Sequence, residues 1–494
     1  MKNRFPVIAL KKDAERRFRA GQDSGHPWVY SNEIQTPFPA KCDGGELVEL
    51  RDSHGNVIAY GYFNTHSLIA FRTLIRADVP RTPHSSRSSS SKDSAPKEVT
   101  SHVSKDLIQP GETEESLVFG LLVGRLRKAW KMREVLGHSG TSFRWVFAEA
   151  DDLPGLIVDR YLFENQKSQA IVFQLNTAGV DRWASWQGGQ FYLKVIETVW
   201  EKISADLVAA GQHNSRRIDF KNTTVILRQD SGARAREGLK EIDVSQTVLQ
   251  LGQVSSVAAL SDVWIDVDQA AFTVDLIGGQ KTGFFLDQRE SVRWLCQVLT
   301  NQPQAGAKDF SVLDLCPYVG QWSVQIAKAL KGRVSATLLD VSEDALERAA
   351  ENLKRVEARK VEIIKGDALS LDESLGEKVP EQLSEKIKNK SFDIVVADPP
   401  AFIKSRKDLG PGKAAYASLF GQAISKVKSG GFIVASSCSG LLTEEDFSDA
   451  LFKGQAKADR TVRWFYRGGH ATDHPILAQF PEGKYLKTWI GLVN

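Results

Sequence analysis

Apolar and polar positions follow a regular alternation along the second half of the chain, which begins near Trp264. Short apolar runs of strand length are separated by longer segments with apolar residues at helical spacing. Strands this apolar are typical of a parallel sheet covered by helices on both faces, which binds ligands at the carboxyl ends of its strands. The runs are FSVLDLC, RVSATLLD, VEIIKGDA, FDIVVADPP and GFIVASSCS. We therefore predict a doubly wound, Rossmann-like α/β domain over residues 263–494.

The first half of the chain has other patterns and predicts two more domains. Residues 1–78 contain short strands divided by Gly, Asp and Asn, which is typical of a small β-rich module. A helical pattern in LLVGRLRKAWKMREVLG, two strand-like runs and an apolar helix near 191–207 predict a central α+β domain over 118–262. Residues 79–117 include a serine-rich stretch without periodicity, for which we expect a flexible linker.

Length and composition agree with a multidomain globular protein. The 494 residues exceed the roughly 250 to 300 that one hydrophobic core can organise. Hydrophobic residues at 42% and charged residues at 25% are ordinary values, and a formal net charge of +3 gives no whole-protein argument for nucleic-acid binding. The amino terminus does not resemble a signal peptide, and no apolar run reaches the roughly 20 residues of a membrane span. We expect a soluble, cytoplasmic protein without membrane attachment.

Carboxylates stand at the predicted strand ends, where a bound ligand would lie. Asp314 ends the first strand, and Gly320 follows in a loop where backbone can approach a ligand at the helix amino terminus. Asp340 ends the next strand and can accept hydrogen bonds from both hydroxyls of a ribose. An alternative role for Asp340 is that of a turn or capping residue, because Ser342 opens a helix just after it.

The next two strand ends strengthen the prediction of a cofactor site. Asp367 and Ala368 stand where the amino group and ring of an adenine could be held. Asp398 and Pro399 begin a D-P-P loop, in which paired prolines cannot continue a strand and therefore fix a rigid loop. This set of carboxylates resembles the class I methyltransferase pattern, which implies S-adenosyl-L-methionine as the cofactor. A nicotinamide cofactor fits less well because the triple-glycine fingerprint is absent.

The cysteines Cys42, Cys296, Cys316 and Cys438 are scattered without a C-x-x-C pair, so we expect neither a metal centre nor a disulfide framework. Cys438 follows the fifth strand and would face the ligand crevice. A buried cysteine commonly serves as a small apolar residue, but a thiolate at this place could act as a nucleophile. Addition of a thiolate to C6 of cytosine lets C5 accept a methyl group, whereas methylation of a nitrogen needs no thiol. We therefore assign Cys438 and Asp398 to the catalytic set.

Substrate contacts are predicted in two segments that mix aromatic and basic residues. In GGQKTGFFLDQRES, Lys281 and Arg289 could meet a phosphate, and Phe284 could contact the ligand or belong to the core. Near the amino terminus, Trp28 follows a run of Lys and Arg, a combination that contacts phosphates and stacks on bases. The alternative for this run is a solvated helix end.

Several long motifs resemble those of one family, the bacterial methyltransferases of large-subunit ribosomal RNA that make 5-methylcytosine and carry an amino-terminal PUA domain. The motifs are GHPWVYSNEI, EADDLPGLIVDRY, GGQKTGFFLDQRES, ADPPAFIKSRKDL, SSCSGLLTEEDF and DHPILAQFPEGKYLK. The resemblance implies a PUA domain that binds RNA, a central α+β domain and a methyltransferase domain. It also implies that Cys438 is the nucleophile and that the cofactor meets the segments around Tyr318, Asp340, Asp367 and Asp398.

This chain departs from the family pattern at the cofactor loop. The family commonly has Y-T-G-G-F, whereas this chain has Val319 and Gln321 within the corresponding Y-V-G-Q-W. The family uses a single cysteine, and Ala401 in the D-P-P-A segment fits this pattern. The group that removes the C5 proton is therefore open.

Two other functions fit the same motifs. D-P-P loops also serve the methylation of amino nitrogens, so the acceptor could be a guanine or adenine nitrogen of RNA. An RNA-binding protein with a degenerate methyltransferase domain is the third reading. The leading prediction is a cytosine-C5 methyltransferase with large-subunit ribosomal RNA as its partner. The sequence leaves a homodimer open.

Overall fold

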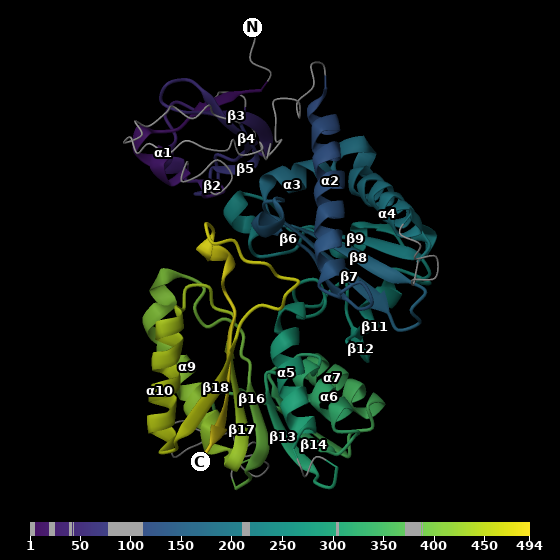
Figure 1. The fold of residues 1–494 in the computed structure, drawn as a ribbon, viewed down its shortest axis with the longest axis vertical. Coiled ribbons are helices and arrows are strands. Elements are labelled where there is room, and N and C mark those ends of the chain that lie inside the picture. Colours follow the sequence, from purple (N-terminus) through teal and green to yellow (C-terminus); the bar gives the residue numbers. More distant parts are fainter. Residues whose placement is uncertain are drawn as a thin grey trace, which may run out of the picture.

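The computed structural model describes residues 5–18, 25–38, 42, 44–77, 112–209, 218–302, 306–370, 387 and 389–494. These residues form three domains, each built on one sheet (Figure 1). No helix in the described ranges is long and apolar enough to cross a membrane.

The amino-terminal domain is a small β-structure, as its sequence predicts. Its strands pair in the order β1-β3-β4-β5-β2, and Phe18 of the helix packs with Phe71 of the sheet in the core. The elements are β1 (Val7–Ala9), α1 (Lys12–Phe18), β2 (Trp28–Val29), β3 (Glu46–Arg51), β4 (Val57–Phe63) and β5 (Phe71–Arg76).

The central domain has a seven-stranded sheet in the order β10-β9-β8-β7-β11-β12, with β6 paired to β7. Helices α2 and α4 cover it, and Trp130, Trp145 and Trp200 pack edge to face between them. The helices are α2 (Glu114–Val135), α3 (Ala178–Ala184) and α4 (Phe191–Ala209). The strands are β6 (Phe143–Phe147), β7 (Leu156–Phe163), β8 (Gln169–Leu175), β9 (Thr223–Arg228), β10 (Val248–Gln250), β11 (Val263–Val267) and β12 (Ala270–Val274).

Two boundaries differ from those expected. α2 starts at Glu114, inside the predicted linker, because Thr113 caps it: the Ser116 N–H donates to Thr113 Oγ1 at 3.1 Å. Residues 79–111 of that linker lie outside the described ranges. Strands β11 and β12 extend the central sheet past residue 262, since Ile265 of β11 pairs with β7. Periodicity identifies such a strand but cannot say which sheet it joins.

The carboxy-terminal domain is the predicted doubly wound sheet. Its order is β15-β14-β13-β16-β17-β19-β18, parallel from β15 to β17 and antiparallel at β19 and β18. The strands are β13 (Phe310–Leu315), β14 (Val334–Asp340), β15 (Lys360–Lys365), β16 (Phe392–Ala397), β17 (Val427–Ser437), β18 (Val462–Gly468) and β19 (Lys487–Val493). The chain leaves β13 in one direction to β14 and later returns to β16 on its other side. This reversal creates a crevice at the carboxyl ends of these strands.

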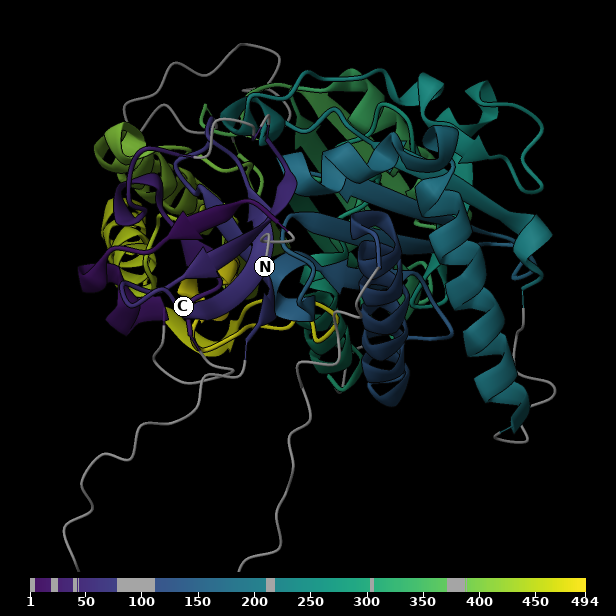
Figure 2. The ribbon, with the colours of Figure 1, turned by 90° about the horizontal axis from the view of Figure 1, so that it is seen from above.

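Helices cover both faces of this sheet, with α5, α6 and α7 on one side and α9 and α10 on the other (Figure 1). They are α5 (Arg289–Thr300), α6 (Gln321–Ala329), α7 (Glu343–Arg355), α9 (Leu409–Ser425) and α10 (Glu444–Ala458). The amino-terminal domain lies above α9 and α10, and the central domain lies above α5 to α7 (Figures 1 and 2).

The connection between β18 and β19 joins the three domains. Its Glu482 carboxylate lies 3.2 Å from His26 Nε2 of the amino-terminal domain. Its Asp473 Oδ2 accepts the N–H of Arg144 in the central domain at 2.8 Å. The same connection ends at Leu486 beside the crevice, so it links the domain interfaces to the candidate site.

Candidate active site

A cavity of about 240 Å³ occupies the crevice at the carboxyl ends of the strands. Most of the residues predicted from the sequence line it: Lys281, Phe284, Tyr318, Asp340, Asp367, Ala368, Asp398, Pro399 and Cys438. Asp314, Gly320, Arg289 and Trp28 do not. The structure thus separates the predicted residues into those that face the cavity and those that support or surround it.

The loop after β13 takes its shape from left-handed backbone positions. Tyr318 has φ 52° and Gly320 has φ 82°, and Gly320 stands just before α6. A Cβ on Gly320 would come within 3.1 Å of Ala349 Cβ on α7. Its left-handed backbone and the close approach of the loop to α7 both favour a glycine at this position.

Tyr318 connects this loop to the segment that precedes α5. Its hydroxyl donates to Gly283 O and accepts the N–H of Gln280, each at 3.1 Å. Its ring meets Phe285 edge to face, with centroids 5.1 Å apart. The segment 280–285 is thereby fixed against the cavity.

Asp314 lies beneath the cavity and supports it. The side chain is fully buried, and Asp314 Oδ2 accepts the Ser323 hydroxyl of α6 at 2.6 Å. Burial raises the pKa of Asp314 to about 7, because nothing in the described structure pairs it with a cation. Asp314 thus anchors α6, and it does not line the cavity.

Asp340 and Asp367 line the cavity and also stabilise the turns after their strands. Asp340 Oδ1 accepts the Ser342 N–H, and Asp367 Oδ1 accepts the Leu369 N–H, each at 2.9 Å. The turn role that was an alternative for Asp340 is therefore real and compatible with ligand contact. These hydrogen bonds fix the orientation of both carboxylates toward the cavity.

Asp398 is the buried carboxylate of the D-P-P loop. Both of its oxygens accept from Gln288 Nε2 at 3.0 Å, and Oδ2 also accepts from Trp322 Nε1 at 3.2 Å. Burial raises the pKa of Asp398 to about 7, and the negative charge of Asp287 adds to this. Near neutral pH this group can therefore exchange a proton.

Cys438 follows β17 and shares the cavity with Asp398. Its loop is tied to the D-P-P loop, since the Ile403 N–H donates to Ser439 Oγ at 3.2 Å and Tyr416 OH lies 2.8 Å from the same oxygen. Burial raises the pKa of the Cys438 thiol to about 11, while the positive charge of Lys281 lowers it.

Among the residues of the cavity wall that were not predicted as site residues are Asp287, Gln288 and Trp322, which surround or donate to the carboxylate of Asp398. Asp287 and Gln288 lie inside the motif GGQKTGFFLDQRES, so a signal for them was present in the sequence. Nothing local marks Trp322 as the donor to Asp398, because that contact joins positions 76 residues apart.

Lys281 and Phe284 line the cavity, but neither is free. Phe284 is fully buried, and its ring centroid lies 5.0 Å from that of Phe272 in the central sheet. It is therefore a core residue that also contributes to the cavity wall. Lys281 Nζ lies 2.7 Å from Asp287 Oδ2. The sequence predicted a phosphate as the partner of Lys281, and in the structure its partner is the carboxylate of Asp287.

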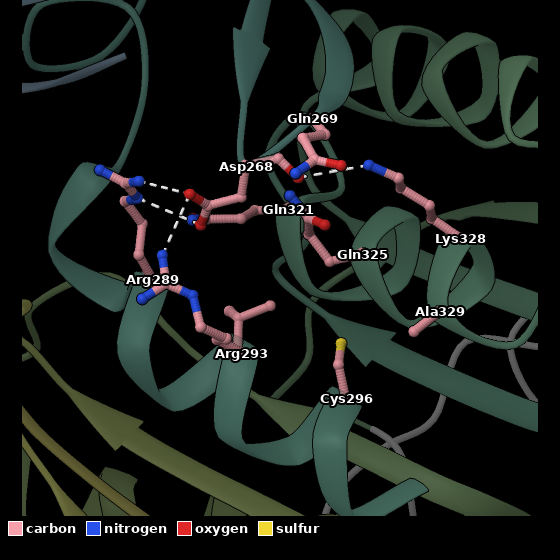
Figure 3. Close-up of a pocket in the computed structure, with 10 residues that line it drawn as sticks. Asp268, Gln269, Arg289, Arg293, Cys296, Gln321, Gln325, Lys328 and Ala329 are labelled. Carbon is pink, nitrogen blue, oxygen red and sulfur yellow. Dashed lines mark hydrogen bonds and ion pairs between the residues drawn. The ribbon is translucent and has the colours of Figure 1, made fainter. Parts of the chain in front are cut away.

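Arg289 belongs to a second cavity of about 380 Å³ (Figure 3). Its side chain is 1% exposed, forms an ion pair with Asp268, and donates to Ser142 O at 2.9 Å. Arg293 and Cys296 line the same cavity, on α5. The guanidinium that was expected to meet a phosphate therefore joins α5 to the central domain.

Trp28 lies at a junction of the three domains. Its Nε1–H donates to Glu149 Oε1 of the central domain at 2.7 Å. Its ring meets Phe480 of the β18–β19 connection edge to face at 4.6 Å, and the Arg72 guanidinium lies 5.2 Å from its centroid. Through these contacts the indole of Trp28 helps to hold the domains together.

Comparison with known proteins agrees with this architecture. Residues 8–76 match a PUA-like domain, and residues 307–478 match a methyltransferase domain. The chain contains both domains. This result confirms the predicted fold class and the predicted placement of a PUA-like module before a methyltransferase domain.

The relatives share this arrangement over nearly the whole chain. A ribosomal RNA large subunit methyltransferase I from Shewanella frigidimarina is 25% identical, covering 98% of this chain and 99% of its own length. The protein of that name from Aliivibrio fischeri is 28% identical over 94% of each. A putative SAM-dependent methyltransferase from Streptococcus mutans has the same fold, with a TM-score of 0.61, 16% identity, and coverage of 99% of this chain and 100% of its own.

Proposed function

We propose that this chain transfers a methyl group from S-adenosyl-L-methionine to C5 of a cytosine in large-subunit ribosomal RNA. The observation that carries the proposal is that the Cys438 thiol lines the same cavity as Asp340, Asp367 and Asp398. A nucleophile for the base and polar groups for the cofactor are thereby within reach of one another. The names of the relatives, which are ribosomal RNA large subunit methyltransferases, support the choice of RNA.

The chemistry of the cavity wall suits the cofactor. Val341, Ala368 and Leu369 provide an apolar surface for a flat adenine ring, between two strand-end carboxylates. Asp340 would accept hydrogen bonds from the ribose hydroxyls, and Asp367 would accept one from the adenine amino group. When bound there, the cofactor supplies an electrophilic methyl group on a sulfonium.

The acceptor carbon needs activation, which Cys438 would provide. C5 of cytosine is too weak a nucleophile to attack the methyl group directly. Addition of the Cys438 thiolate to C6 makes C5 enamine-like, so C5 takes the methyl group; a base then removes the C5 proton and the thiolate leaves. Overall, the C5–H bond is replaced by a C5–CH3 bond: the C5 proton passes to the base, the cofactor sulfur would keep the electron pair of its former bond to the methyl group, and the Cys438 thiolate is regenerated.

Asp398 fits the role of the acid in this sequence. Addition of a thiolate to C6 moves negative charge onto N3 of the ring. Because the pKa of Asp398 is raised by burial to about 7, part of the enzyme carries a proton there at neutral pH and can donate it to N3.

An exposed basic segment follows the D-P-P loop and suits an RNA chain. Lys404, Arg406 and Lys407 are solvent-exposed. They stand beside Phe402, which lines the cavity. Cations at this place would hold the phosphates on either side of an inserted base.

The Cys438→Ser variant tests the proposal, with Cys296→Ser in the second cavity as the matched control. We expect Cys438→Ser to bind S-adenosylmethionine in calorimetry and to form no 5-methylcytidine, while the control methylates normally. RNA from cells lacking the gene, complemented with each variant, is digested and its nucleosides are identified by mass spectrometry. Normal activity of Cys438→Ser would remove the nucleophile from the proposal, and a methylated purine product would replace cytosine as the acceptor.

A further inference from the structure

The surroundings of Cys438 disfavour the thiolate that the proposed reaction needs. A thiolate adds to C6, but burial and the carboxylates Asp398 and Asp287 all favour the neutral thiol. A buried anion of this kind needs a nearby cation if it is to form at a useful rate. A cation in the cavity wall would supply this balancing charge.

Lys281 is the one Lys or Arg side chain in the described wall of the cavity. The other charged and titratable groups that act on Cys438 come from several elements. They are Asp287 before α5, Asp398 after β16, Tyr416 on α9, Tyr485 before β19 and Lys487 on β19. Lys487 is not part of the wall; its Nζ donates to Ser439 O at 2.8 Å and Tyr485 O at 2.9 Å, which fixes the loop of Cys438.

The ammonium of Lys281 is held in a cage and is not a flexible surface charge. Asp287 is 2% exposed and lies 2.7 Å from Lys281 Nζ, while Tyr485 OH donates to the same carboxylate at 2.5 Å. The ammonium also lies 4.2 Å from the ring centroid of Phe285 and 5.8 Å from that of Tyr485. These contacts keep the charge beside the cavity.

The backbone of this segment is fixed as firmly as the side chain. Lys281 has φ 53°, in the left-handed region, and Tyr318 OH binds the backbone one residue before it, at Gln280 N, and two residues after it, at Gly283 O. A side chain meant to reach phosphates in solution would not require this arrangement. This geometry suits an ammonium group that acts on one fixed group inside the site.

We infer that Lys281 is a positioning residue that promotes formation of the Cys438 thiolate, and that Asp287 and Tyr485 hold it in place. This inference rests on the proposed function of Cys438 as the nucleophile. In the step itself, the thiol loses its proton to solvent water, and the sulfur keeps the electron pair beside the Lys281 ammonium. This role toward sulfur is an alternative to the contact with a phosphate that the sequence predicts for Lys281.

The test measures thiol reactivity without RNA or cofactor, so it does not depend on methyl transfer. Wild type, Lys281→Met and Lys281→Arg are treated with iodoacetamide between pH 6 and pH 10, and mass spectrometry follows the peptide that contains Cys438. Lys328→Met, in the second cavity, is the matched control. Thermal unfolding of each variant establishes that it is folded.

We expect Lys281→Met to slow alkylation of Cys438 at pH 8 by about tenfold or more, since one pKa unit changes the thiolate fraction tenfold. Lys281→Arg should restore most of the rate, and Lys328→Met should behave as wild type. An unchanged pH profile in Lys281→Met, or no recovery in Lys281→Arg, would overturn the inference.

A second measurement separates sulfur from phosphate as the neighbour of Lys281. If Lys281 met a phosphate, Lys281→Met would reduce the salt dependence of RNA binding by about one unit of slope. We expect no such change, and a reduced slope would overturn the inference. Failure of the proposed function has a different signature, namely normal methylation by Cys438→Ser whatever the alkylation profile.

Discussion

Two buried carboxylates have pKa shifts in opposite directions. One lies at the interface between the amino-terminal and central domains, and the other lies in the cavity of the carboxy-terminal domain. Burial raises the pKa of Glu237 at the interface, but the Arg72 charge and hydrogen bonds from Asn64 and Ser67 hold it below its ordinary value. In the cavity, Asp398 receives only neutral donors among the described residues, and burial raises its pKa to about 7.

The buried carboxylate at the interface therefore has a structural role, whereas the one in the cavity suits a chemical role. A buried carboxylate with a cation and several donors is stable as an anion and joins domains, as the contact between Arg72 Nη2 and Glu237 Oε1 at 2.6 Å does. A buried carboxylate such as Asp398, whose hydrogen-bond donors are all neutral, is costly to the fold and can exchange a proton near neutral pH. The comparison predicts that substitution at the two places will affect different properties.

The largest effect is expected for Asp398→Asn. An amide can donate a hydrogen bond but is far too weak an acid to protonate N3, so single-turnover methylation should fall by about 100-fold or more. The same change removes an uncompensated buried acid, so the free energy of unfolding in urea should not decrease. Wild-type rates in this variant would contradict a role for Asp398 as the acid, and Trp28→Phe serves as the control with an intact cavity.

A smaller effect is expected for Asp314→Asn, in the pH dependence of stability. Burial raises the pKa of Asp314 from its ordinary 3.8 to about 7 in the folded protein. Its contribution is therefore fully present below about pH 4 and is lost as the pH rises to about 7. Relative to wild type, Asp314→Asn should gain about 3 kcal/mol of unfolding free energy between pH 5 and pH 8, because the wild type loses this contribution over that range. The measurement is urea unfolding of both proteins at the two pH values. The same difference in unfolding free energy between variant and wild type at both pH values would refute this assignment.

The smallest effect is expected for Trp28→Phe. Phenylalanine keeps the ring against Phe480 but removes the donor to Glu149, which should lower the free energy of unfolding by about 1 kcal/mol. RNA affinity, measured by fluorescence anisotropy, should stay unchanged. A loss of affinity with unaltered stability would return Trp28 to the RNA-contacting residues that its sequence context first indicated.

The sequence by itself determined the doubly wound sheet and much of its site. Strand and helix periods are local properties, and in a parallel sheet the carboxyl ends of the strands meet at one edge. Asp340, Asp367, Asp398 and Cys438 therefore come together for topological reasons, and all four line the cavity.

Only the tertiary structure decided what each polar residue contacts. Asp314 was predicted at a strand end, as Asp340 was, but it lies within β13 opposite Leu338, where it accepts the Ser323 hydroxyl and does not line the cavity. Arg289 pairs with Asp268, and Trp28 with Glu149, 121 residues away. Hydrogen bonds and ion pairs of this kind depend on how domains pack, and neither periodicity nor spacing encodes that packing. The balance of charges around Cys438 is for the same reason a property of the folded molecule.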